Sequence, residues 1–123
     1  MSAVQASGID HLAIHVRDLD VSKAFYMGVL GLAVDREFPG GSFLKCGTQI
    51  LGLIAAEGAD VAGGIEVNHV ALNLTSGRYD DVKAALERAG VEVLGRPGAP
   101  EERCIYLKDP DQHLLQLVVP KEG

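Results

Sequence analysis

Three of the four histidines in this 123-residue chain fall at positions where their side chains could act together. His11 and His15 belong to a segment in which polar and aliphatic residues alternate, so both imidazoles face the same side of a predicted strand. His69 opens a second segment of the same kind. Imidazole is the commonest metal ligand and a general base near neutral pH, although a lone histidine on a strand is usually a polar surface residue.

The elements that must position these side chains form a β-α-β-β-β module over about residues 8–56. Alternation predicts a strand over 8–16, and apolar residues spaced by three and four predict a helix over 19–30 that Gly31 ends. Three short β-prone runs follow, at 32–38, 43–46 and 48–56.

The second half of the chain repeats this order. After a predicted linker at 57–66, alternation predicts a strand over 67–74 and apolar spacing a helix over 77–89, followed by strands at 91–94, 104–107 and 113–119. A shift of 58 positions places His11 on His69. We therefore predict an α+β fold: one domain over 1–123, with two tandem βαβββ modules (8–56 and 67–119) forming a cupped mixed sheet with helices outside.

The repeat also predicts which polar side chains share the open face of the sheet. His11 and His15 lie on that face in the first module, and His69 and Asn73 take the corresponding places in the second. Gln116 joins them if the more aliphatic row of the last strand faces the helices.

Composition excludes several classes of function. Eleven Lys and Arg against seventeen Asp and Glu give a net charge of −6, which disfavours binding to nucleic acid or an anionic membrane. No apolar run reaches the roughly 20 residues of a membrane span, and the start lacks the pattern of a signal peptide, so we expect a cytoplasmic protein. Cys46 and Cys104 are too few for a disulfide scaffold and lack zinc-module spacing.

Five short motifs occur in order along the predicted elements. They are Asp10-His11, Phe25-Tyr26, Val29-Leu30-Gly31-Leu32, Asn68-His69-Val70 and Asp109-Pro110-Asp111. In this arrangement the chain resembles the vicinal oxygen chelate superfamily of glyoxalases, bleomycin-resistance proteins and extradiol dioxygenases, over about residues 8–119.

The resemblance implies a divalent metal in the cup, such as zinc, nickel, manganese or iron, with ligand positions at His11, Gly52, His69 and Gln116. Gly52 has no side chain that could coordinate, and Gln116 stands where most metal-binding members have Glu. The implied donors are therefore two imidazoles and one amide oxygen. A neutral amide in place of the anion weakens iron retention, which disfavours ring cleavage.

The resemblance also requires a group that takes a proton from the substrate. His15 is the one other titratable side chain that the pattern places in the cup, so it is the candidate base, while Glu37 and Glu57 could reach the cup from loops.

Further candidates for contact with a ligand lie in the second module. They are Asn73, Arg103 and Tyr106, although the tyrosine fits the edge of the core equally well. The segment 109–111 is predicted as a turn whose Asp side chains cap backbone amides, without a catalytic role. His113, on the face opposite Gln116, is predicted to be packed or at the surface.

Two functions remain open at this point. The first is a glyoxalase-like enzyme that chelates vicinal oxygens of a small metabolite through a divalent metal, of isomerase, lyase or dioxygenase type. The second is a non-catalytic protein of the bleomycin-resistance type, which needs no metal and sequesters a cationic drug. The acidic charge favours the second and the twin histidines favour the first, and the resemblance implies a homodimer that closes the cup.

Overall fold

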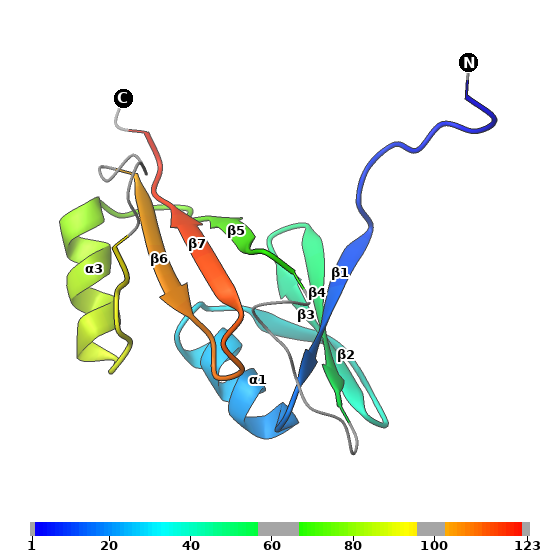
Figure 1. Ribbon diagram of the computed structural model, residues 1–123, viewed down its shortest axis with the longest axis horizontal. Helices are drawn as coiled ribbons and strands as arrows, with labels where there is room; N and C mark the ends of the chain where they lie inside the picture. Colours follow the sequence, from blue (N-terminus) through cyan, green and yellow to red (C-terminus); the bar gives the residue numbers. More distant parts are fainter. Residues whose placement is uncertain (1, 57–66, 96–102, 122–123) are drawn as a thin grey trace.

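The computed structural model describes residues 2–56, 67–95 and 103–121 (Figure 1). The first module comprises β1 (His11–Val16), α1 (Leu19–Gly28), β2 (Ala33–Phe38), β3 (Gly41–Cys46) and β4 (Gln49–Ala55). The second comprises β5 (Val70–Asn73), α3 (Tyr79–Arg88), β6 (Cys104–Lys108) and β7 (Leu114–Val118). The modular α+β fold is confirmed, while the predicted linker 57–66 lies outside the described residues.

The strands form two separate mixed sheets. The first has the order β1-β4-β3-β2, with β1 parallel to β4 and the other neighbours antiparallel. The second has the order β5-β7-β6, with β5 parallel to β7. The strands that open each module, β1 and β5, therefore both lie at a sheet edge.

The strand predicted over 91–94 is wrong. In the part of the chain that the structure describes, Leu94 alone of these residues pairs, through an isolated antiparallel bridge to Tyr106. The backbone N–H of Val91 instead donates to the Leu86 carbonyl, 3.0 Å away, and Gly90 has a positive φ of 80°. The start of the segment is thus used to end α3 in the manner of a helix C-cap, which leaves too few residues for a ladder.

The two modules share one hydrophobic core, built from the inward faces of both sheets and both helices. Figure 1 shows α3 alongside β6, and α1 near the turn between β6 and β7. No helix in the described ranges has the length and apolar character needed to cross a membrane.

The face that α1 buries contains two polar side chains in addition to residues of the predicted apolar stripe, of which Phe25, Val29 and Leu30 pack against the core. The helix begins after Asp18, whose side chain accepts from the Val21 N–H, as expected of an N-cap. Val21 itself is 50% exposed, whereas Ser22 and Tyr26 are fully buried. Periodicity of apolar residues could not identify these two because both are polar side chains that need a buried partner.

Asp109, in the turn after β6, supplies the partner of Tyr26. Its Oδ2 accepts from the Tyr26 hydroxyl and from His113 Nδ1, each at 2.7 Å, and its Oδ1 accepts from the backbone N–H groups of Asp111 and His113. Burial would raise the pKa of Asp109, but the hydrogen bonds from His113 and Tyr26 hold that pKa below its ordinary value. Burial, and then the Asp109 charge, raises the pKa of Tyr26, so the phenol remains a donor.

Asp111 extends this contact between the modules. Its carboxylate accepts from the Ser22 hydroxyl at 3.3 Å and from the Arg17 backbone N–H at 3.1 Å. The predicted capping role of the 109–111 turn is confirmed, because backbone N–H groups of the turn donate to the Asp109 carboxylate. The turn also holds α1, which the sequence pattern did not indicate.

Candidate functional site

The histidine face of β1 is open. Ile14 and Val16 are buried in the core, whereas His11, Ala13 and His15 are exposed on the opposite face, as the alternation predicts. The second module repeats the pattern, with Ala71 and Asn73 exposed on β5. The polar side chains of both opening strands therefore remain accessible to a ligand.

The two candidate metal-binding imidazoles are oriented in the same way. Nδ1 of His11 lies 2.8 Å from Asp10 Oδ2, and Nδ1 of His69 lies 2.7 Å from Asn68 Oδ1. Because a carboxylate or amide oxygen only accepts, a neutral imidazole in this contact carries its hydrogen on Nδ1 and keeps the Nε2 lone pair for a metal. The sequence signal was the acceptor that precedes each histidine, a role for Asp10 and Asn68 that the sequence reasoning missed.

Gln116 lies on the face of β7 opposite the core. Leu115 and Leu117 are each 1% exposed, which confirms that the aliphatic row faces the core. The Gln116 Nε2 donates to Cys104 Sγ at 3.2 Å, and no described residue donates to its Oε1. The amide oxygen is the atom of this side chain that is able to coordinate a cation.

The position of Gly52 is closed to any larger ligand side chain. A Cβ built there would lie 2.9 Å from the Phe43 ring and 3.2 Å from the Ala13 Cβ. Phe43 also stacks at a tilt on His11, with ring centroids 5.1 Å apart. An aromatic ring therefore fills the space beside His11 in the first module.

A row of paired residues across the first sheet leads from β1 to a positively charged side chain, Arg36. Ala13 pairs with Gly52, Gly52 with Phe43, and Phe43 with Arg36, so the row crosses the sheet from β1 to β2 on its open face. The Arg36 guanidinium carbon lies 5.2 Å from the Phe43 ring centroid. The sequence reasoning missed Phe43 and Arg36, because only the pairing of the strands reveals that Phe43 neighbours His11 and that Arg36 neighbours Phe43.

The other predicted site residues have diverse environments. His15 is exposed on β1, in register with Ile54, and Asn73 is exposed on β5. Tyr106 is buried and in register with Gln116. Arg103 is half-buried, and its Nε donates to the Val119 carbonyl at 3.2 Å.

Within residues 2–56, 67–95 and 103–121, no three His, Cys, Asp or Glu side chains come together as a metal-binding group. The predicted donor set contains only two residues of these types, because its third member is the amide of Gln116. This donor set of two imidazole nitrogens and one amide oxygen is chemically suited to a divalent cation of the zinc, nickel or manganese kind.

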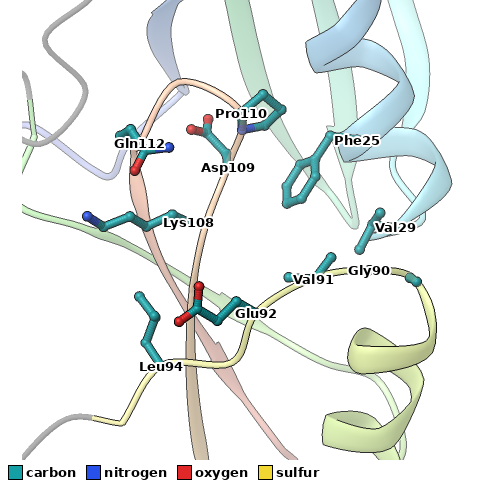
Figure 2. A pocket seen from close by; sticks show the side chains of 11 residues that line it. Phe25, Val29, Gly90, Val91, Glu92, Leu94, Lys108, Asp109, Pro110 and Gln112 are labelled. Atoms are coloured by element: carbon teal, nitrogen blue, oxygen red, sulfur yellow. The ribbon is translucent and has the colours of Figure 1, made fainter.

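A pocket of about 390 Å³ lies away from these residues (Figure 2). Figure 2 shows Phe25 of α1 and Val29, which follows the helix, near Val91, which follows α3, with Pro110 of the β6–β7 turn above them. No predicted site residue within the described ranges lines this pocket, and Glu57 lies outside them.

Comparison with known proteins agrees with the fold. The profile of the Glyoxalase/Bleomycin resistance protein/Dioxygenase superfamily matches residues 8–117. Glutathione transferase FosA of Serratia marcescens is 29% identical over 113 residues, covering 90% of this chain and 79% of that protein. Lactoylglutathione lyase of Agrobacterium tumefaciens has a TM-score of 0.69 and 26% identity, covering 93% of this chain and 94% of that one. The fosfomycin resistance protein FosX of Listeria monocytogenes, solved with Mn(II) and sulfate, has a TM-score of 0.75 and 22% identity, covering 95% and 93%. The chain belongs to the glyoxalase/bleomycin resistance protein/dioxygenase superfamily.

Proposed function

We propose that this protein is a glyoxalase-like, metal-dependent enzyme acting on a small metabolite that has two oxygens on adjacent atoms. The observation that carries the proposal is the matched orientation of His11 and His69, each with Nδ1 engaged by an oxygen of the preceding residue. An imidazole that is only a surface residue has no need of this arrangement, whereas a metal ligand gains a fixed tautomer and ring orientation from it.

The proposal assigns a chemical role to each candidate residue. His11 and His69 would hold the cation through Nε2, and Gln116 through its amide oxygen. The cation, when bound, would polarise the adjacent oxygens and acidify a neighbouring C–H bond. His15, on the same face as His11, would accept the proton. Asn73, Arg103 and Tyr106 remain predictions for residues that contact the substrate.

The named relatives support divalent-metal chemistry. The FosX structure was solved with Mn(II), and the Agrobacterium protein is a lactoylglutathione lyase. They do not identify the substrate of this chain, because the reaction of a superfamily member depends on its own site. A cytoplasmic location also remains a prediction.

We further propose that a homodimer completes the cup. β1 and β5 both end their sheets, and an accessible edge strand presents unpaired backbone groups that proteins usually cover. In a two-fold contact, each surface patch of one copy meets its counterpart on the other copy in both directions. If β1 of one copy lies against β5 of the second, β5 of the first therefore lies against β1 of the second, and both edges are covered. Sedimentation equilibrium at micromolar concentration should give twice the chain mass, and a monomer would contradict this part of the proposal.

The rival function, sequestration of a cationic drug, has one observation in its favour. Phe43 fills the position beside Gly52, which makes this part of the open face partly apolar. However, the charged side chains on this face of the first sheet include Arg36, which has no carboxylate within ion-pair distance among the described residues, and Lys45, which is paired with Asp35. The uncompensated positive charge of Arg36 disfavours a cationic ligand despite the acidic charge of the whole chain.

Calorimetric titration of the metal-free protein with zinc, nickel and manganese tests the site. Wild type should bind one cation per chain, and both His11→Ala and His69→Ala should abolish binding because too few protein ligands remain. Gln116→Glu should tighten binding, since a carboxylate of nearly the same length neutralises one charge of the cation. Asp10→Ala should weaken binding by about tenfold, because the His11 ring loses its orienting partner.

His15→Ala is the matched control, since it removes an imidazole from the same face that is not a proposed ligand. Its metal affinity should equal that of wild type. Retained affinity in His11→Ala would rule out the proposed site, and unchanged affinity in Gln116→Glu would remove Gln116 from the ligand set and favour an organic-ligand groove.

A further inference from the structure

On the basis of the proposed function, we propose that Arg36 selects substrates that carry an oxyanion beyond their vicinal oxygens. The substrate class is thus a small organic acid with two adjacent oxygens at one end and a carboxylate or phosphonate at the other. Arg36 binds the far end and determines specificity, while the cation site at His11 binds the near end.

The geometry places the two ends one aromatic ring apart. The Phe43 ring lies 5.1 Å from the His11 ring, and the Arg36 guanidinium carbon lies 5.2 Å from the Phe43 ring. All three side chains stand on the open face of one sheet, on β1, β3 and β2. A short ligand lying over Phe43 can therefore contact both the imidazole side and the guanidinium.

Two glycines make room for the rings on which Arg36 rests. A Cβ at Gly52 would lie 2.9 Å from the Phe43 ring, and a Cβ at Gly41 would lie 2.4 Å from the Phe38 ring. The two rings meet edge to face at 5.3 Å, and Arg36 lies 5.9 Å from the Phe38 centroid. Contact with both ring faces restricts the guanidinium, so less entropy is lost when it forms a bidentate bond to an oxyanion.

Among the described residues, Arg36 differs from the nearby lysines because it has no acidic partner. In the described residues no carboxylate lies within ion-pair distance of Arg36, whereas Lys45 on the same face is 3.8 Å from Asp35, and Lys23 is paired with Glu37. A planar guanidinium in this state is suited to a carboxylate or phosphonate.

The test measures the affinity of the manganese-loaded protein for three related acids by calorimetry. 2-Oxopentanoate carries only the vicinal oxygens, 2-oxoglutarate adds a carboxylate, and 2-oxo-4-phosphonobutanoate replaces that carboxylate by a phosphonate. Wild type should bind at least one of the last two about tenfold more tightly than 2-oxopentanoate. The tighter of the two identifies the oxyanion that the site prefers.

Arg36→Gln should reduce this preference to about one while leaving the affinity for 2-oxopentanoate unchanged. Arg88→Gln, which removes the same charge from the last turn of α3, is the control and should keep the preference. Equal binding of all three acids to wild type, or an unchanged preference in Arg36→Gln, overturns the role of Arg36 and leaves the proposed function intact. Failure of all three acids to bind the manganese-loaded protein overturns both proposals.

Discussion

Tyr26→Phe removes a single oxygen from the contact between the two modules. The Tyr26 hydroxyl donates to Asp109 Oδ2 at 2.7 Å across 83 positions of sequence. Tyr26 is 0% exposed and Asp109 2% exposed, so water does not replace the lost bond. The phenylalanine ring keeps the packing of the tyrosine, and the substitution therefore tests the hydrogen bond itself.

The expected loss follows from the charge and the remaining partners of the acceptor. A hydrogen bond to an ionised group contributes about 1.5–3 kcal/mol. Asp109 keeps the bonds from His113 and from two backbone N–H groups, so its charge is not left unsatisfied. We expect the free energy of unfolding to fall by about 2 kcal/mol and Tm by roughly 5–10 °C for a domain of this size.

Urea denaturation followed by far-ultraviolet circular dichroism at pH 7 measures this change. Tyr79→Phe is the control, because Tyr79 begins α3 outside the Asp109 contact and should change stability by less than about 0.5 kcal/mol. An equally small loss in Tyr26→Phe, with an unchanged dependence on urea, would refute the view that this hydrogen bond stabilises the contact between the modules.

Three further predictions concern the loss of stability in acid through Asp109, the unpaired hydroxyl of Ser42, and the close contact between Gly52 and Phe43. The pKa of Asp109 is lower in the folded protein than in the unfolded chain, so its contribution to stability is complete above about pH 5 and lost as pH falls through the folded value. Wild type should therefore lose more stability than Asp109→Asn between pH 5 and pH 3 in urea titrations, and parallel curves would contradict this. Ser42 is fully buried, and its Oγ has no hydrogen-bond partner among the described residues. Ser42→Ala should therefore raise the free energy of unfolding by up to about 1 kcal/mol in the same assay. A clear loss of stability in this variant would show that the hydroxyl has a partner after all. Gly52→Ala should cost about 1–3 kcal/mol because the new methyl group meets the Phe43 ring, and adding Phe43→Ala should make the glycine substitution nearly neutral in a double-mutant cycle.

Much of the local structure was predictable because it repeats with a short period. The alternation that starts at His11 predicted both the strand and the face that its side chains share, and the helices match the predicted segments to within two residues at each end. The same alternation in β7 placed Gln116 opposite the core. These features depend on neighbours within a few positions, so one sequence is enough to reveal them.

The sequence alone therefore determined the two modules, except for the strand predicted over 91–94, and the open sheet faces that carry His11 and His15 in the first module and Asn73 in the second. Only the tertiary structure decided what surrounds that face. Strand register brings Phe43 beside His11 and Arg36 beside Phe43, and a one-residue change of register would move each to another face or row. Likewise, the bond from Tyr26 to Asp109 joins residues far apart in the chain, and no periodic pattern encodes which buried polar groups will meet when two modules pack.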